Sequence, residues 1–433
     1  MAIQSLLVIL VVLLALLFLG VPISYAIAVS SLTAIVSTID LNVAVLTAAQ
    51  RTFVGMSKFS LTAIPFFILA GNIMNQGGIA KRLVDFVMSI LGKLPGALLI
   101  TNIGTNALFG AISGSASAAA AAVGSMIRDG AEEQGYDPAV TAATNAASSC
   151  SGLLIPPSNA LITYSLASGG TSVAALFMAG YIPGIIWAVA CAVVGVILAK
   201  KLGYKGTPGK FDWKNLGVCT LRALPSLSLI IVVIGGIVGG VFSATEGSAI
   251  AVVYSLILAF CYRSINLKSL WKIIVDSAKM SGMVVFLVGV SNILGWVMAF
   301  LQIPDAVAAL LLGLTNNKYI ILLIMNVILL VSGTFMDVTP AILIFTPLFL
   351  PICQSFGMST IQFGMILVYN LCIGNITPPV GNALFVGIKV GRTSLEKVMP
   401  YMLMYYVAII AGLLLVTYVP AVSLVLPQVT GLA

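Results

Sequence analysis

The sequence predicts an all-α polytopic membrane protein with two inverted repeats. Each repeat has five transmembrane crossings, one of them a broken helix, and one re-entrant hairpin. Three observations carry this prediction. The first is composition, because 60% of the residues are hydrophobic and only 7% are charged, so a water-exposed surface could not be built. The second is a pattern, Cys-x-Gly-x-x-x-Pro-Pro, that occurs at residues 150–157 and again 222 residues later. The third is the confinement of basic residues to short loops between apolar segments.

The double-proline pattern predicts a broken helix in each half. Pro378 and Pro379 lack a backbone N–H and clash with the preceding turn, and Gly374 and Gly381 make the backbone permissive on either side. Unwound backbone at membrane depth is tolerated only where protein buries it or where it lines a cavity. The two breaks therefore predict a functional centre.

Hydropathy and length predict the crossings and two hairpins. Two further apolar stretches, about 95–127 and 319–352, are interrupted halfway by the polar clusters ISGSAS and SGTFMD, so each half is too short to span. We expect them to be re-entrant hairpins whose tips align as Ser113-Gly114-Ser115 and Ser332-Gly333-Thr334. The proposed crossings are residues 3–19, 23–39, 60–75, 138–165, 172–199, 223–241, 246–262, 280–301, 362–388 and 398–425.

Charge orients these segments. If the basic loop 200–214 is cytoplasmic, 17 of the 20 basic residues fall on that side and only Arg51, Lys58 and Lys318 fall outside. Both termini are then periplasmic in a bacterial inner membrane. The first hairpin enters from the cytoplasm and the second from the outside. Residues 3–19 lack a basic leader and a cleavage site, so we interpret them as a retained crossing.

The halves match in order as well as in motif. Amphipathic segments at about 42–56 and 265–279 precede a crossing, a hairpin, a broken helix and a final crossing. Five crossings per half is an odd number, so the second half is inverted, as in secondary transporters. The expected units are 1–56 (scaffold and arm) and 57–214 (transport part and loop) of repeat 1, then 215–279 (scaffold and arm) and 280–433 (transport part) of repeat 2.

Several functions are excluded by composition. There is no histidine, which removes histidine-based catalysis, metal ligation and proton relays. The six cysteines form no CxxC pair, and we interpret them as small buried residues. The net charge of +8 is spread over membrane loops and indicates topology rather than nucleic-acid binding. We therefore expect no enzyme, no catalytic residue and no cofactor.

Each hairpin tip is expected to face a break, where freed carbonyls and hydroxyls suit a hard cation such as Na⁺. For Ile155 and the prolines only the main-chain oxygen would contribute. The alternative is that these small residues simply let helices pack closely. The first proposed sodium site consists of Ser113, Ser115, Gly152, Ile155 and Pro156, and the second of Gly333, Thr334, Gly374, Thr377 and Pro378.

Asp337 is one of only two carboxylates deep in apolar sequence, and it lies at the second tip. Three roles remain open for it: cation ligand, proton carrier, or cap of the following helix. The other carboxylate, Glu246, is interpreted as a helix-start residue. Asn159, Asn375 and Asn382 flank the breaks and either contact substrate or cation or only satisfy unwound backbone.

These motifs resemble those of the large membrane subunit of tripartite ATP-independent periplasmic (TRAP) transporters across essentially the whole chain. The matching segments are ISGSASA, SGLLIPPSN, SGTFMDVTPAILI and GNITPPVGN. The related divalent-anion/sodium symporters share the architecture but usually carry Ser-Asn-Thr at their tips, whereas Ser-Gly-Ser and Ser-Gly-Thr stand here. The combination favours the TRAP family.

The resemblance implies sodium-driven import by an elevator-like motion, in which hairpins and broken helices move against a fixed scaffold. It also implies two partners in addition to the lipid bilayer: a small four-helix membrane subunit, expected here as a separate polypeptide, and a periplasmic substrate-binding protein. The expected cargo is a carboxylate of the C4-dicarboxylate or sialic acid class, with sialic acid favoured. Because Ile155 stands where the second repeat has Thr377, the two sodium sites cannot be chemically identical.

The main rival is a stand-alone sodium- or proton-coupled anion symporter of the divalent-anion/sodium type. No Arg or Lys lies inside a proposed crossing, which is unusual for a stand-alone anion carrier. It fits better with a soluble protein that selects the substrate, while helix N-termini at the tips attract the carboxylate. An intramembrane enzyme lacks its metal-binding motif here, and a passive channel does not need paired broken helices.

Overall fold

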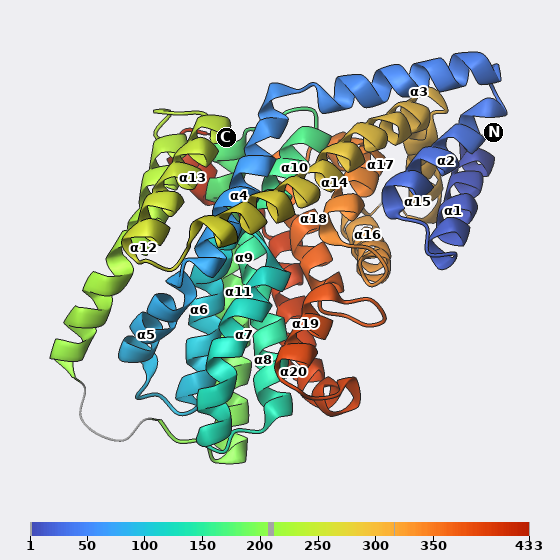
Figure 1. Cartoon of the computed structure of the whole chain (residues 1–433). Coiled ribbons are helices and arrows are strands. Elements are labelled where there is room, and N and C mark those ends of the chain that lie inside the picture. Colours follow the sequence, from blue (N-terminus) through green and yellow to red (C-terminus); the bar gives the residue numbers. More distant parts are fainter. Residues whose placement is uncertain (1, 207–211, 316, 433) are drawn as a thin grey trace.

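The structure is a computed structural model that describes residues 2–206, 212–315 and 317–432 (Figure 1). All regular elements in these ranges are helices, as the composition predicts. Lys210 of the predicted cytoplasmic loop lies outside the described residues. The first half contains α1 (Ala2–Phe18), α2 (Ile23–Val36), α3 (Leu41–Met56), the 3₁₀ turn η1 (Phe59–Thr62), α4 (Ala63–Gln76), α5 (Ile79–Leu91), α6 (Ala97–Ser113), α7 (Ala116–Glu133), α8 (Pro138–Ser149), α9 (Ser151–Leu154), α10 (Asn159–Ala167) and α11 (Val173–Leu202). The second half contains α12 (Trp213–Val238), α13 (Ala244–Cys261), α14 (Leu267–Phe300), α15 (Ile303–Leu314), α16 (Lys318–Gly333), α17 (Val338–Ser355), α18 (Thr360–Gly374), α19 (Asn382–Val390), α20 (Leu395–Tyr418) and α21 (Pro420–Val429).

Fewer unbroken spans exist than the ten predicted crossings. Among the described residues, six helices are long and apolar enough to cross a membrane: α11, α12, α13, α14, α17 and α20. A seventh span results if α3 and α4, which meet at a bend of 61°, are joined. The difference arises because two predicted crossings are divided among short helices, α8–α10 and α18–α19, and others, such as α1 and α2, are shorter than 18 residues. The expectation that each hairpin half is too short to span is wrong for α17, whose 18 residues are long and apolar enough to cross.

The two amphipathic arms differ from each other. In the first half the arm α3, capped by Asp40, ends at Met56 and turns into α4. In the second half the predicted arm 265–279 and crossing 280–301 form one helix of 34 residues, α14. A capping box between Asn266 and Ser269 starts this helix, and the stretch that follows contains no proline to interrupt it. Figure 1 shows α3 and α14 running along the same side of the molecule, where they pack together.

Both hairpins and both breaks are present. Helices α6 and α7 fold back on each other through Gly114 and Ser115, and α16 and α17 do so through residues 334–337. The breaks fall where the double prolines predict them, at residues 155–158 and 375–381. Helices α5 and α15 were not predicted, because neither is long enough to give a hydropathy signal of a crossing.

A central helix, α11, holds the two broken helices together. Its Trp187 is fully buried and donates from Nε1 to the carbonyl oxygen of Ala147 in α8 at 2.8 Å. The same indole meets the ring of Tyr369 in α18 edge-on, with centroids 4.9 Å apart. The indole, which is both hydrogen-bonded and packed, thus fixes α8 against α18. The two breaks consequently lie in one central region.

Candidate functional site

The first hairpin tip is a two-residue turn. Gly114 adopts a left-handed conformation, with φ of 61°, which ends α6 and reverses the chain. Ser115 then caps α7 by accepting a hydrogen bond at Oγ from the N–H of Ala118 at 3.4 Å. Ser113 donates from Oγ to the carbonyl oxygen of Ser115 at 3.4 Å. Both serine oxygens of the first proposed sodium site therefore lie at the tip.

The first break contacts this tip directly. Ile155 is extended, the bond between Pro156 and Pro157 is cis, and Ser158 caps α10. Asn159 donates from Nδ2 to the carbonyl oxygen of Gly114 at 3.5 Å. The chain after the break is therefore tied to the chain at the tip.

The second tip and break are tied in the same way. The N–H of Val380 donates to the carbonyl oxygen of Thr334 at 3.1 Å. Asn382 donates from Nδ2 to Asp337 Oδ1 at 3.3 Å. Asp337 precedes α17, yet its side chain makes no capping hydrogen bond. The carboxylate is therefore directed to Asn382, and Asp337 does not cap α17 with its side chain.

Glycine pairs let each hairpin cross its broken helix at backbone distance. A Cβ built on Gly152 would lie 2.2 Å from Cα of Gly110, and one built on Gly374 would lie 2.5 Å from the carbonyl carbon of Gly333. The sequence alignment of Gly114 with Gly333 is therefore wrong, because Gly110 occupies the equivalent contact. The second turn is longer than the first. Ser115 and Asp337, which precede α7 and α17, keep the spacing of 222 residues between the repeats. The residues before the two turns therefore do not align at that spacing.

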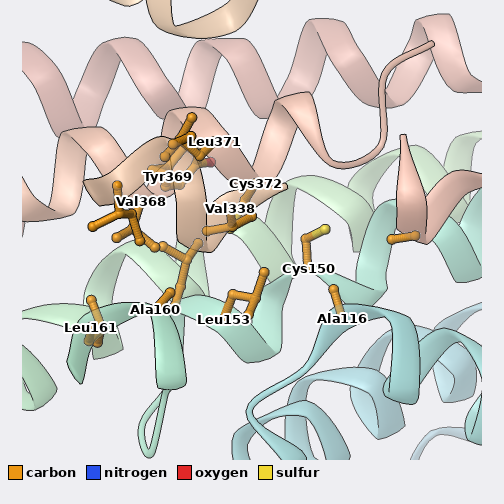
Figure 2. Close-up of a cluster of buried hydrophobic side chains, with 14 of the residues drawn as sticks. Ala116, Cys150, Leu153, Ala160, Leu161, Val338, Val368, Tyr369, Leu371 and Cys372 are labelled. Atoms are coloured by element: carbon orange, nitrogen blue, oxygen red, sulfur yellow. The ribbon is translucent and has the colours of Figure 1, made fainter. Parts of the chain in front are cut away.

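Both tips and both breaks open onto one cavity of about 150 Å³. Its polar lining includes Ser115, Asn159, Asp337 and Asn375. Figure 2 shows part of its apolar wall, where side chains from α7, α9, α10 and α17 come together; these are Ala116, Leu153, Ala160 and Val338. The opposite wall consists of α4 and α14, through Ile64, Ile68, Met280 and Val284, all of which lie in the segments 57–214 and 280–433 that were expected to be transport parts.

Two buried amide oxygens in this lining have no hydrogen-bond partner. They are Oδ1 of Asn159 and Oδ1 of Asn375, whose amide nitrogens are directed to Gly114 O and to Cys150 Sγ at 3.9 Å. An unpaired buried polar atom is costly, so such atoms usually mark a place where a ligand, ion or water completes the bonding. Since the two asparagines belong to the two different breaks and both line one cavity, they point to a single ligand between the repeats.

The remaining predicted site residues lie behind this cavity. They are absent from its lining, and Asn382 contacts the lining only through its hydrogen bond to Asp337. Thr377 donates its hydroxyl hydrogen to the carbonyl oxygen of Ile373 at 2.7 Å, which leaves oxygen lone pairs for a cation. The residues that do not line the cavity are Ser113, Gly152, Ile155, Pro156, Gly333, Thr334, Gly374, Thr377, Pro378 and Asn382.

The donor set around the crossings suits an alkali cation. It consists of carbonyl and hydroxyl oxygens, and the described residues contain no group of three or more Cys, Asp or Glu that could hold a transition metal. No Lys or Arg lines the central cavity either. Any cation bound here would therefore supply the positive charge that an anionic ligand needs.

A polar layer behind each tip was missed by the sequence analysis. Asn106 in α6 donates from Nδ2 to Ser148 Oγ at 2.8 Å in α8, and Asn370 in α18 donates from Nδ2 to Asn326 Oδ1 at 2.9 Å in α16. These buried amides bind the first arm of each hairpin to the first part of each broken helix. Asparagines inside apolar segments were the signal that could have found them.

The chain matches the family described as tripartite ATP-independent periplasmic transporter, DctM component, over residues 10–422. It therefore belongs to this TRAP family. It is 38% identical over 94% of its length to the isethionate TRAP transporter permease protein DctMQ of Oleidesulfovibrio alaskensis, of which it spans 64%. It is 33% identical to the C4-dicarboxylate TRAP transporter large permease protein DctM of Rhodobacter capsulatus, covering 99% of this chain and 100% of that protein. It is also 32% identical to the sialic acid TRAP transporter large permease protein SiaM of Vibrio cholerae, covering 96% of each.

The fold is similar to a solved structure as well. The YdaH transporter of Alcanivorax borkumensis matches with a TM-score of 0.59, covering 87% of this chain and 88% of that chain at 14% identity. This likeness shows the fold alone. The TRAP resemblance of the four motifs is confirmed, and the chain is a large permease subunit of the family.

Proposed function

We propose that this TRAP permease imports a small organic carboxylate, driven by Na⁺. The carboxylate is of the C4-dicarboxylate or sialic acid class, with sialic acid favoured, and it binds in the central cavity between the two tips. One Na⁺ binds at each glycine crossing, with the oxygens of the two predicted sodium sites. Relatives named for C4-dicarboxylate and for sialic acid support this class of cargo.

The observation that carries the proposal is that Asn159 and Asn375 line one cavity and that each has an unpartnered buried side-chain oxygen. Amide oxygens accept hydrogen bonds from hydroxyl groups of a substrate or coordinate a cation. The N-termini of α7 and α17 start at Ser115 and Asp337 in the same lining, and their positive ends favour a negative ligand. Na⁺ at the crossings would add positive charge next to the carboxylate.

A second cavity lies further along the helices that line the central cavity, and we propose it as the route by which the anion enters. It measures about 310 Å³ and is lined by residues of the same three helices, α10, α14 and α17, among them Leu166, Ser291 and Leu343. Arg51 and Lys58 line it, and no carboxylate does. Because both cations fall on the predicted periplasmic side, this cavity would attract the anion before it reaches the central site.

The two parts that enclose the central cavity suit an elevator mechanism within inverted repeats. The hairpins and broken helices form one wall and α4 and α14 form the other, so sliding of one wall past the other would carry the ligand across. In this proposal α4 and all of α14 belong to the scaffold, beyond the boundaries expected at residues 57 and 280. The proposed setting is a bacterial inner membrane with both termini periplasmic. The proposed partners are a small four-helix membrane subunit and a periplasmic substrate-binding protein.

Uptake by proteoliposomes tests the proposal. The chain is reconstituted with its small subunit and a candidate binding protein, and labelled succinate, sialic acid or isethionate is offered with an inward gradient of Na⁺, K⁺ or choline. We expect accumulation of one carboxylate with Na⁺ only. Equal accumulation with K⁺ would refute sodium coupling, and accumulation of isethionate alone would refute the carboxylate class.

The stand-alone anion symporter is disfavoured by membership of the TRAP family. The same experiment separates the two, since a stand-alone carrier accumulates substrate without the binding protein, whereas the proposed permease needs it.

A further inference from the structure

A basic cavity is lined by residues of α5, α12 and the turn that follows α13. Figure 1 shows α5 and α12 near each other in the molecule. We call this basic cavity the α5–α12 cavity, and its volume is about 490 Å³. Its charged lining is three cations, Lys81, Arg82 and Arg222, against one carboxylate, Asp85. None of these residues lines the central cavity, so this is a separate site.

In the α5–α12 cavity Arg82 is held in place, and the three cations outnumber the single carboxylate. Arg82 donates from Nη1 to the carbonyl oxygen of Gly78 at 3.0 Å, and its guanidinium carbon lies 3.5 Å from the ring centroid of Tyr262. Within the described ranges, neither Lys81 nor Arg222 forms an ion pair with a carboxylate. Arg82 is therefore pre-positioned, with N–H groups left to bind an anion.

The N-terminus of α5 adds to the positive potential of the three cations. The helix begins after Gly78, which lines the cavity and offers no side-chain cap to the first N–H groups. These groups and the helix dipole favour an anion at this end. The N-terminus of α5 and the three cations therefore both favour an anion in the α5–α12 cavity.

The surroundings of Arg222 are apolar and exposed. Arg222 is the only charged residue of α12 after Lys214, and it lies about 14 Å along the helix from Trp213. Its neighbours Leu221 and Leu224 are 70% and 50% exposed. An arginine in such a setting reaches for phosphate at the membrane surface while apolar side chains meet acyl chains. The cavity therefore fits an amphiphile better than a free anion.

We propose that the α5–α12 cavity binds the headgroup phosphate of an anionic phospholipid, whose acyl chains lie along the exposed face of α12. Basic pockets between helices on the cytoplasmic side are suited to such headgroups, and the positive-inside pattern places these cations on that side. Since α5 connects α4 to the first hairpin and α12 begins the second half, the lipid bridges two parts of the chain that are distant in sequence.

The test uses the purified full chain in detergent and native mass spectrometry with added phosphatidylglycerol or phosphatidylcholine of identical acyl chains. We expect phosphatidylglycerol to bind more tightly, and Arg222→Gln or Lys81→Gln to weaken it about fivefold each. Lys272→Gln, on the exposed face of α14, is the matched control and leaves binding unchanged. Binding should also weaken as ionic strength rises.

Three results would overturn the proposal. They are equal binding of the two lipids, unchanged binding by both variants, and inorganic phosphate that binds as tightly as phosphatidylglycerol, which would assign the site to a free anion. Arg222→Lys keeps the charge and retains most of the binding, which separates loss of charge from loss of fold. This test needs no transport substrate, so its outcome does not depend on the proposed function.

Discussion

Gly152 and Gly110 meet backbone to backbone, because a Cβ on Gly152 would lie 2.2 Å from Cα of Gly110. Gly374 and Gly333 repeat this contact in the second half. The hairpins can cross the broken helices so closely only because no side chain intervenes. Gly152 belongs to the first proposed sodium site, and Gly333 and Gly374 belong to the second.

The first prediction concerns this crossing. Gly152→Ala forces two backbones apart, so we expect it to lower the free energy of unfolding by about 1–3 kcal/mol, as overpacking does. Gly130→Ala is the control, since a Cβ there meets nothing within 4 Å and alanine favours the helix. Thermal unfolding of the purified variants measures both. A Gly152→Ala protein as stable as the control would show that the crossing tolerates a side chain.

The double prolines, the polar clusters at the tips and the glycines allowed the breaks and hairpins to be predicted from sequence, because each acts on its own backbone. The pairing of Gly110 with Gly152 could not be predicted, since it depends on the different lengths of the two turns. The cavity wall from α4 and α14 was also inaccessible, because Ile64 and Met280 are ordinary apolar residues until the fold brings them together.

The second prediction separates binding from stability at Asn375. Asn375→Ala removes an unpartnered buried oxygen, so we expect little loss of stability but at least a tenfold loss of uptake, the size of one lost ligand contact of about 1.4 kcal/mol. Asn326→Ala is the contrasting variant, because Asn326 binds both Asn370 and Thr417 and its loss should lower the melting temperature. Unchanged uptake by Asn375→Ala would remove that residue from the binding site.

The third prediction concerns Asp337. Its carboxylate makes no capping hydrogen bond, so Asp337→Ala should impair uptake without the stability loss of about 1 kcal/mol that follows removal of a cap. Asp40→Ala is the matched control, since Asp40 does cap α3, accepting from the N–H of Asn42 at 2.8 Å. Thermal unfolding and uptake are compared for the two variants. Equal destabilisation by both would restore the capping role of Asp337.

The fourth prediction tests the orientation in the membrane. Cys261, at the end of α13, is exposed, whereas the other five cysteines are buried. With both termini periplasmic, Cys261 faces the cytoplasm. A membrane-impermeant maleimide should therefore label it in inverted vesicles and not in intact cells, and Cys261→Ser should abolish the labelling. Labelling from the periplasmic side would reverse the topology.

Glu246, the other carboxylate in apolar sequence, lies at the start of α13. It completes a capping box with Ser243, whose N–H donates to Glu246 Oε2 at 2.7 Å, at the start of α13. The interpretation of Glu246 as a helix-start residue is therefore confirmed, and it needs no part in transport.

The central claim is that oxygens at the two crossings bind Na⁺. Thermal unfolding of the purified protein in matched NaCl, KCl and choline chloride tests it most directly, because a ligand that binds only the folded state stabilises it by about 2.7 kcal/mol at a hundredfold excess over its dissociation constant. We predict stabilisation by Na⁺ alone, reduced in Ser115→Ala and in Thr377→Ala. Thr33→Ala is the control, because its hydroxyl makes the same kind of bond to Val29 O at 2.8 Å outside the site. Equal stability in the three salts at saturating concentration would contradict the paired sodium sites.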